Sequence, residues 1–293
     1  PFSAAFLVQA PVRSSVVPRL SDAVRIVADT TIYRLRKREM GNLVTSVTLA
    51  LALRLPLADV AHRAAFGFLL NVFVYLVNDL LDVEIDQQAA GRDVARTRFL
   101  ADHLPAGVLG AALVLAASGA AAALHGRGLL IVLAINVVVI VAYSRWLKRH
   151  PFVDILSMAT WGASMALVGC PLDDVVGLKL VGLLGILSMV TEGVQVIRDA
   201  ESDARVGVRT TAVALGVSRT AMATRALVIL AAAYATLLLN MAVGPVLLLA
   251  LIPKLDTARA DRSWDLFRML FGGCWLAILG HLVLAGHLWG VIR

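Results

Sequence analysis

Charged and aromatic side chains are scarce in this chain. Of its 293 residues only 16% are charged and 6% are aromatic, while 59% are hydrophobic and the mean hydropathy is +0.83. Soluble domains carry about 25% charged residues, so this composition excludes an ordinary soluble protein. It predicts a membrane protein whose apolar runs cross a bilayer.

Cysteine is almost absent, and the sequence has no glycine-rich phosphate loop and no redox motif. Cys170 and Cys274 both lie in apolar stretches without metal-ligand spacing, so we expect two buried free thiols. The six histidines are scattered along the chain. These absences exclude a disulfide framework and a zinc site of the usual spacing.

Nine apolar stretches predict an all-α, polytopic bundle of about nine transmembrane helices, since a bilayer core needs about 20 apolar residues per helix. The eighth stretch is the shortest. We expect residues 1–40 to form a cytoplasmic N-terminal segment and residues 41–293 a single transmembrane domain. The nine stretches are 41–57, 61–77, 104–124, 129–143, 152–170, 175–197, 226–242, 244–253 and 266–290.

Lys and Arg residues concentrate on one side of this predicted bundle. If the nine spans alternate, 22 of the 27 basic residues fall on one side of the membrane. The excess predicts a cytoplasmic N-terminus and a C-terminus outside, as in a bacterial-type inner membrane. The net charge of +7 then reflects topology and anionic lipid, and it does not indicate a nucleic-acid partner.

The stretch "NDLLDVEID", residues 78–86, places four acidic side chains at the end of the second predicted span. Helical spacing puts Asn78, Asp82 and Asp86 along one side of that helix. Carboxylates at a helix C-terminus oppose the helix dipole, and this group also repels itself. Oxygen ligands without Cys or His favour a hard cation, so we predict Mg²⁺ shared with substrate phosphates.

A second acidic run follows the sixth predicted span in "VTEGVQVIRDAESDARVGVRTTAVALG". Asp199 and Asp203 lie four residues apart, and Glu192 lies on the same helical stripe. A third loop, "YSRWLKRHP", adds Tyr143 and Lys148. Carboxylates, Mg²⁺ and basic groups at the mouth of an apolar bundle predict a site for a diphosphate whose remainder is apolar.

These motifs resemble those of the UbiA-type membrane prenyltransferases. That family has an N-D-x-x-D-x-x-x-D run after helix 2 and a D-x-x-x-D run after helix 6. Both runs are present here, as are a similar G-x-x-T-x-x-V-x-L-G tail and a Tyr-Ser…Leu-Lys loop. The matching residues are Asn78, Asp79, Asp82, Asp86, Asp199, Asp203, Gly207, Thr210, Val213, Leu215, Gly216, Tyr143, Ser144, Leu147 and Lys148.

The resemblance implies Mg²⁺-dependent transfer of a prenyl group from an isoprenyl diphosphate to a small aromatic acceptor, quinone-like or from specialised metabolism, at the cytoplasmic mouth. The implied catalytic residues are Asp82, Asp86, Asp199, Asp203 and Lys148. The implied metal ligands are Asn78, Asp79, Asp82, Asp86, Asp199, Asp203 and Glu192. The expected substrate-binding residues are Asn78, Tyr143, Arg205, Arg209, Arg98, Arg38, Asn71 and Tyr75.

Two departures from the family pattern affect these expectations. Gln195 and Val196 stand where many relatives have a Lys-Asp pair, so one usual acidic position is missing. Glu192 and Glu201 are the two candidates to replace it, and we expect Glu192 to do so. The stretch "RTRFLADHLPAG" replaces the family's usual Arg-Pro pair before a Ser-Gly turn, in a loop that bears on acceptor recognition.

Two other functions remain open on the sequence alone. A membrane terpene cyclase on the same scaffold would ionise the same diphosphate and return hydrocarbon or alcohol without an acceptor. A non-enzymatic carrier of lipids or anions would use the basic mouth only to hold its ligand.

Overall fold

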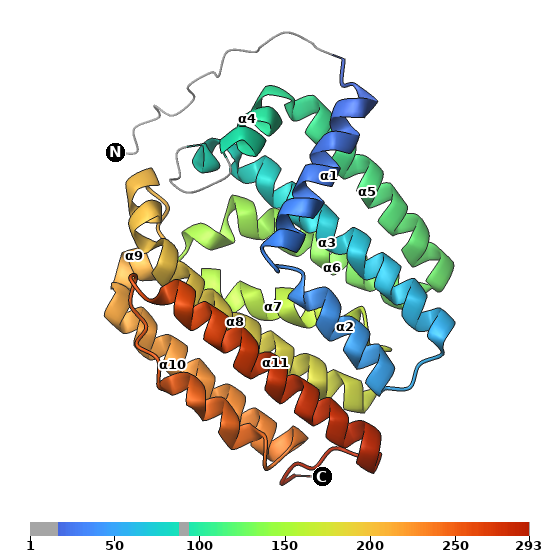
Figure 1. Ribbon diagram of the computed structural model, residues 1–293, viewed down its shortest axis with the longest axis vertical. Helices are drawn as coiled ribbons and strands as arrows, with labels where there is room; N and C mark the ends of the chain where they lie inside the picture. Colours follow the sequence, from blue (N-terminus) through green and yellow to red (C-terminus); the bar gives the residue numbers. More distant parts are fainter. Residues whose placement is uncertain (1–16, 88–93, 293) are drawn as a thin grey trace.

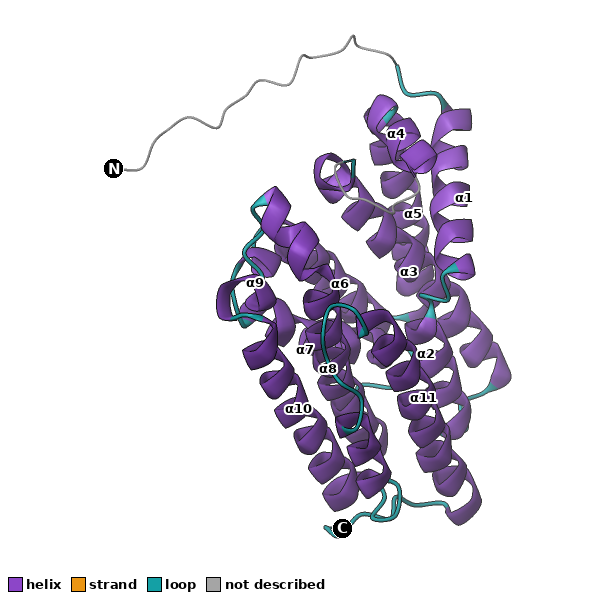
Figure 2. Cartoon of the chain, turned by 60° about the vertical axis from the view of Figure 1, so that its left-hand side comes forward, coloured by secondary structure: helices purple, strands orange, loops and turns teal. Residues whose placement is uncertain are grey.

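The computed structural model describes residues 17–87 and 94–292, and most of them lie in helices. No strand occurs within these two ranges (Figure 2). The first sixteen residues of the predicted N-terminal segment lie outside them. The predicted all-α class is therefore confirmed.

The helices follow one another with short connections (Figure 1). Two 3₁₀ segments, Leu147–Arg149 and Gly244–Leu251, and a π-helical turn, Ala235–Leu239, interrupt the α-helices. The α-helices are α1 (Leu20–Arg36), α2 (Gly41–Ala52), α3 (Leu57–Asp86), α4 (Val94–Asp102), α5 (Leu104–His125), α6 (Arg127–Arg145), α7 (Val153–Leu167), α8 (Val175–Val206), α9 (Thr211–Leu215), α10 (Val217–Tyr234) and α11 (Ala260–Ala285).

Six helices form a closed ring in which α2, α3, α6, α7, α8 and α11 each contact the next, and α11 returns to α2. Helix α5 packs outside α3 and α6, and α10 packs outside α8. One apolar cluster fills the α8, α10 and α11 side, and a second fills the α3, α6 and α7 side. The ring therefore holds two neighbouring cores with α2 and α7 between them.

The predicted count of nine spans is not confirmed. Within the described residues, six helical stretches are long and apolar enough to cross a membrane, and α2 and α7 are shorter apolar helices. The six stretches are Leu57–Asp86, Leu104–His125, Arg127–Arg149, Val175–Val206, Val217–Leu239 and Ala260–Ala285. The chain is an integral membrane protein with fewer full-length helical spans than the sequence predicts.

The eighth predicted span is an irregular segment that leads the chain from the end of α10 to the start of α11. Asn240 lies beside Trp289 at one end of α11, and Asp261 lies 3.9 Å from Arg198 at the other end. The chain between them passes through the 3₁₀ segment Gly244–Leu251, which at about 2.0 Å per residue covers only about half of a bilayer core. Leu247 is fully buried, as irregular backbone at membrane depth requires.

The predicted N-terminal segment includes α1, which packs on α5 and α3. Its boundary at residue 40 falls in the turn between α1 and α2. Ala23 and Ile26 are buried in this contact, whereas Leu20, Val24 and other apolar side chains of α1 stay exposed.

Both cysteines are free and buried, as predicted. Burial raises the pKa of the Cys170 thiol to about 12, so this thiol stays protonated at neutral pH. Neither cysteine belongs to the site described below.

Candidate active site

The first acidic run occupies the last turns of α3, where the chain after α6 comes back to meet it. The Ser144 hydroxyl donates to Asn78 Oδ1 at 3.2 Å. Lys148 Nζ forms an ion pair with Asp82 Oδ1, although the two residues are 66 positions apart. The Tyr-Ser…Leu-Lys loop and the first acidic run therefore belong to one site.

Lys148 lies on the 3₁₀ turn Leu147–Arg149. Its side chain and that of Asp82 are only 12% and 13% exposed, so water screens their attraction less than at an open surface. Among the described residues no ion pair joins Lys148 to Asp203 of the second acidic run, although Lys148 contributes to the electrostatic surroundings of Asp203. Lys148 thus pairs with the first acidic run and lies near the second.

The second acidic run lies at the end of α8. Arg198 holds the Asp199 carboxylate with two hydrogen bonds of 2.8 and 2.9 Å, and the Thr210 hydroxyl donates to Asp203 Oδ2 at 3.3 Å. Gly207 ends the helix with φ +75°, a left-handed conformation that glycine adopts without strain. This reversal brings Thr210 back onto Asp203.

Asp154 at the start of α7 holds the tail that follows Gly207. Its carboxylate accepts from the Thr211 backbone N–H at 2.6 Å, from the Thr211 hydroxyl and from the Ile155 N–H at 2.8 Å. Asp154 is completely buried. The family-like tail is therefore fixed to α7 by one buried carboxylate.

Glu192 lies inside the bundle on α8, seven residues before Asp199 of the second acidic run. Tyr143 donates a hydrogen bond to Glu192 Oε1 at 2.6 Å, and the Glu192 side chain is 4% exposed. Val196, at the position where relatives carry an acid, packs in an apolar cluster with Ile155 and Met189. Glu192 lies four residues before this position, and its hydrogen bond with Tyr143 joins α8 to α6.

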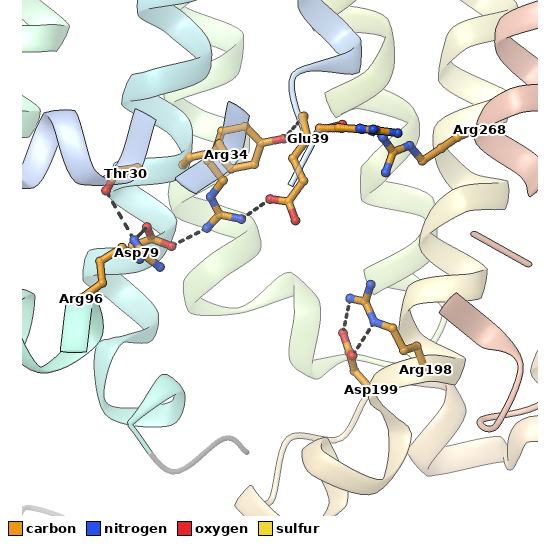
Figure 3. Close-up of polar contacts among 10 residues, drawn as sticks. Thr30, Arg34, Glu39, Asp79, Arg96, Arg198, Asp199 and Arg268 are labelled. Atoms are coloured by element: carbon orange, nitrogen blue, oxygen red, sulfur yellow. Dashed lines mark hydrogen bonds and ion pairs between the residues drawn. The ribbon is translucent and has the colours of Figure 1, made fainter. Parts of the chain in front are cut away.

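Asp79 has different partners from its neighbours in the first run (Figure 3). Arg34 of α1 reaches Asp79 Oδ1 at 2.5 Å, and Arg96 of α4 reaches Asp79 Oδ2 at 2.6 Å. Arg34 also donates to Glu39 at 2.6 Å. Asp79 is 2% exposed, so its two oxygens are both engaged by arginines and it anchors α1 and α4 to α3.

Arg34 keeps its charge in this buried position. Burial lowers the pKa of its guanidinium, but Asp79 and Glu39 raise it by a larger amount, so the net shift is upward. The ring of Tyr75 lies 4.5 Å from the guanidinium, which adds a cation–π contact. Arg34 therefore stays positively charged at physiological pH.

A cavity of about 490 Å³ opens between α2, α8 and α11 beside this network. Apolar side chains form most of its wall, and Arg38 and Arg268 also line it. The remaining lining residues are Leu35, Met40, Gly41, Asn42, Val44, Thr45, Leu184, Leu187, Ser188, Thr191, Phe271, Gly272, Trp275 and Leu276. Its size suits a small organic ligand.

The remaining residues expected in the site differ in their burial and in their partners. Arg98 and Arg209 are exposed, and Arg205 is exposed with its guanidinium on the Glu201 carbonyl. Asn71 is fully buried and donates to the Gly67 carbonyl at 2.8 Å. Tyr75 donates to the Glu39 carbonyl at 2.6 Å, and Asp86 is buried at the end of α3.

The donor set of the site suits a hard cation. Its candidate ligands are oxygen atoms of Asn78, Asp82, Asp199 and Asp203, with no Cys or His, and each of the four side chains already accepts a contact from a neighbouring residue. In the ranges the structure describes, no group of three or more acidic, His or Cys residues is close enough to hold a metal alone. Mg²⁺ commonly takes one or two carboxylates and completes its shell with phosphate and water, so the residues fit an ion shared with a phosphate ligand.

The sequence profile of the UbiA prenyltransferase family matches residues 42–258, which is most of the chain. The chain belongs to this family. No curated protein sequence matches it. As a member of the family it is a membrane prenyltransferase.

Solved structures share the fold of this UbiA-family protein. A structure of digeranylgeranylglyceryl phosphate synthase has a TM-score of 0.65 at 14% identity and covers 89% of this chain and 99% of its own. A UbiA homologue from Archaeoglobus fulgidus bound to DMAPP and Mg²⁺ has a TM-score of 0.64 at 17% identity, with 88% and 99% covered. The same homologue bound to GPP and Mg²⁺ gives the same values.

Several residues around the site are missed by the sequence motifs. Arg34, Glu39 and Arg96 pair with or surround Asp79, and Asp154 fixes the tail. Arg268 could have been found, because a charged residue inside the apolar run 266–290 is costly to bury and is a functional candidate. The others carry no local signal, since their partners come from distant segments.

Proposed function

We propose that this protein transfers the prenyl group of an isoprenyl diphosphate to an aromatic acceptor within the membrane, with Mg²⁺ as cofactor. The observation that carries the proposal is the position of Lys148, which comes from the turn after α6 and pairs with Asp82 of the first acidic run. A fixed cation beside carboxylates that can hold a metal ion suits a metal-bound diphosphate.

Asn78, Asp82, Asp86, Asp199 and Asp203 are the residues that would hold Mg²⁺ together with diphosphate oxygens. Bound there, Mg²⁺ supplies positive charge that stabilises the diphosphate as it leaves. The Archaeoglobus homologue with the same fold is bound to DMAPP or GPP and Mg²⁺, which supports this ligand set. Asp79 is less suited to the role because Arg34 and Arg96 engage both of its oxygens.

Lys148 binds the diphosphate, and its ion pair with Asp82 opens when substrate enters. The bond between C1 of the allylic chain and the diphosphate oxygen breaks, and the electron pair leaves with the diphosphate. An electron pair of the acceptor then forms the new bond to C1, and the acceptor loses a proton. Buried apolar walls around α3, α6 and α8 exclude water that would capture the allylic cation.

The cavity between α2, α8 and α11 provides space for an acceptor, and no residue of the acidic runs lines it within the described residues. Its wall includes Phe271 and Trp275, whose rings can stack on an aromatic acceptor. Val44 and Leu276 line it and are 61% and 56% exposed, so its side faces the lipid, from which an apolar acceptor enters.

We also infer that the end of the bundle carrying the two acidic runs faces the cytoplasm. Most basic residues gather in the segments at that end, and such residues are retained on the cytoplasmic side. The transmembrane domain then begins near residue 41. The site lies at the cytoplasmic end of this domain, next to α1 of the N-terminal segment.

A product assay tests the proposal directly. Purified protein is incubated with Mg²⁺, isoprenyl diphosphates of graded length and a panel of phenols, quinolones and naphthoates, and products are identified by mass spectrometry. We expect a product equal to acceptor plus prenyl group minus one hydrogen, formed only with Mg²⁺ and absent in Asp82→Ala. A terpene hydrocarbon or alcohol formed without acceptor, or no release of diphosphate, would contradict it.

A further inference from the structure

Helix α1 carries a row of exposed apolar side chains, although it is not one of the candidate membrane spans of the described chain. A helix turns by about 100° per residue, so positions 20, 24, 28, 31 and 35 all fall within about 80° of its circumference. Leu20, Val24 and Leu35 are 61%, 60% and 52% exposed. We call this row the apolar stripe, and it consists of Leu20, Val24, Ala28, Thr31 and Leu35.

Thr31 is the one polar member of the apolar stripe, and its hydroxyl already has a partner. It donates to the Val27 carbonyl of the same helix at 2.8 Å, so it presents no unpaired donor to an apolar environment. The apolar stripe therefore has no side chain that requires water.

Charged side chains occupy a different face of α1. Positions 22, 25, 29 and 36 fall within about 60° of one another and are centred about 130° from the apolar stripe. This charged face consists of Asp22, Arg25, Asp29 and Arg36. Ile32, which is 45% exposed, lies at the border of the two faces.

The third face of α1 is buried against α5 and α3. It consists of Ala23, Ile26, Thr30 and Arg34. Helix α1 therefore has one face against the protein, one exposed apolar face and one exposed charged face. This is the pattern of a helix that lies where protein, lipid and water meet.

The charged face and the apolar stripe border different parts of the bundle. The Arg25 guanidinium carbon lies 4.0 Å from the ring centroid of Phe99 on α4, and Asp29 and Phe99 line the same small space. Val27, which borders the apolar stripe, lies against α5 so closely that a Cβ at Gly110 would be 3.0 Å from its methyl group. The charged face thus borders α4, beyond the end of α3, and the apolar stripe borders the part of the bundle that spans the membrane.

Helix α1 crosses α3 instead of running parallel to it (Figure 1). Val27 and Leu76 approach the same point of α5, at Gly110. Arg34, seven residues after Val27, reaches Asp79. The chain advances about 10 Å along α1 over these seven residues, whereas its contacts on α3 move only from residue 76 to residue 79.

The crossing lies at the level where the apolar run of α3 ends. Counted from Leu57, the roughly 20 helical residues that a bilayer core requires end near residue 77. Asn78 and Asp79 follow at once. A helix that crosses α3 at this level has acyl chains on one side and water on the other.

We propose that α1 lies in the membrane–water interface at this end of the bundle, with its apolar stripe against lipid acyl chains and its basic residues on the phosphates of anionic lipids. Arg19, Arg36 and Lys37, at the two ends of α1, are exposed and form no ion pair within the ranges that the structure describes. Guanidinium and ammonium groups bind phosphate oxygens, and basic residues near a membrane are attracted to anionic lipids. This placement of α1 is independent of the reaction that the enzyme catalyses.

Spin labels on neighbouring residues test the placement. Val24→Cys and Leu35→Cys put a label on the apolar stripe, and Arg25→Cys and Arg36→Cys put one on the adjoining charged face. The full chain is reconstituted in vesicles of phosphatidylcholine with one quarter phosphatidylglycerol. The wild-type chain, whose two cysteines are buried, is the blank. We expect oxygen, which concentrates in acyl chains, to relax the labels at positions 24 and 35 more than a water-soluble nickel chelate does, and the reverse order at positions 25 and 36.

Three results would overturn the placement. Nickel access at all four positions would put α1 in water, and oxygen access at all four would put it among the acyl chains. Exclusion of both reagents from positions 24 and 35 would mean that another part of the protein covers the apolar stripe.

Hydrogen exchange of the α1 amides tests the contact with lipid phosphates. In wild type we expect slower exchange in the mixed vesicles than in vesicles of phosphatidylcholine alone. The combined change Arg19→Gln, Arg36→Gln and Lys37→Gln should remove this difference. The control is Arg259→Gln with Arg262→Gln, two exposed arginines at the start of α11, and it should keep the difference.

Exchange of the α8 amides at the wild-type rate shows that each variant is folded. Equal exchange of α1 in the two kinds of vesicle, or a difference that survives the triple change, would contradict the role of the phosphates.

Discussion

Lys148 pairs with Asp82 from a 3₁₀ turn that also carries Arg149. The two basic residues differ in surroundings, because Arg149 is exposed and Lys148 is largely buried. A diphosphate that enters between the acidic runs would exchange the Asp82 carboxylate for its own oxygens on Lys148. Of these two basic residues, only Lys148 is therefore expected to contribute to catalysis.

Lys148→Ala should lower the rate of prenyl transfer by about 10- to 100-fold, because a hydrogen bond from a charged donor is worth about 1.5 to 3 kcal/mol. Steady-state release of diphosphate measures the rate. Arg149→Ala is the control and should remain within about twofold of wild type, as expected for an exposed side chain. Equal rates for Lys148→Ala and wild type would mean that Lys148 contributes only to the orientation of the protein in the membrane.

The roles of Glu192 and Tyr143 can be distinguished by comparing a variant of each residue. If Glu192 replaces the acid missing at Val196, Glu192→Gln should raise the Mg²⁺ concentration needed for half-maximal turnover. Tyr143→Phe removes one hydrogen bond and should cost only about 1 kcal/mol of stability with the Mg²⁺ response unaltered. An unchanged Mg²⁺ response in Glu192→Gln, with lower thermal stability, would leave its carboxylate purely structural.

Helices α1 and α4 are joined to α3 through one carboxylate. Asp79 takes Arg34 from α1 and Arg96 from α4, with side-chain exposures of 2%, 9% and 10%. Removing one partner of a buried ion pair leaves the other charge without compensation. The attachment of α1 and α4 to α3 therefore depends on Asp79 more than on the helix propensities of their own residues.

Asp79→Asn should destabilise the attachment of α1 by an amount on the order of 3 kcal/mol. Hydrogen exchange of the amides of α1 measures this, with faster exchange expected there than in α8 or α10. Asp29→Asn is the control, because Asp29 pairs with Arg25 at 3.6 Å on the surface. If α1 exchanged at the wild-type rate while Mg²⁺-dependent turnover fell, Asp79 would be a metal ligand after all.

Hydrophobic runs locate the long helices well. They do not show that the segment between α10 and α11 departs from a continuous α-helix. The run 244–253 reads as a span, yet Gly244 and Pro245 open a 3₁₀ segment instead. Asn240 contributes to the break, since its side chain accepts from the Ala242 and Val243 N–H groups at 3.0 Å and forms a turn. Proline and asparagine thus override an apolar composition that favours a helix.

Helical spacing and family motifs locate the residues on α3 and α8, because those side chains follow one another on single helices. The sequence does not reveal the partners of Asp79 or the hydrogen bond of Arg268 to the Arg38 carbonyl. These contacts join segments far apart in the chain, and each depends on how the ring of helices closes. A prediction from local spacing therefore treats Asp79 and Asp82 alike, although their neighbours differ.

The whole bundle brings two acidic runs, each on its own long helix, to the same end of the ring, with Lys148 paired to Asp82 of the first run. Packing of α6 and α7 between α3 and α8 determines their separation. If this arrangement is one diphosphate site, binding of substrate and of Mg²⁺ must be linked through both runs.

The affinity for geranyl diphosphate as a function of Mg²⁺ concentration tests this claim most directly. In wild type we predict that Mg²⁺ strengthens binding by about 100-fold or more, and that Asp82→Asn and Asp203→Asn each abolish most of this dependence. An affinity independent of Mg²⁺, or full dependence retained in either variant, would show that the two runs do not form one site.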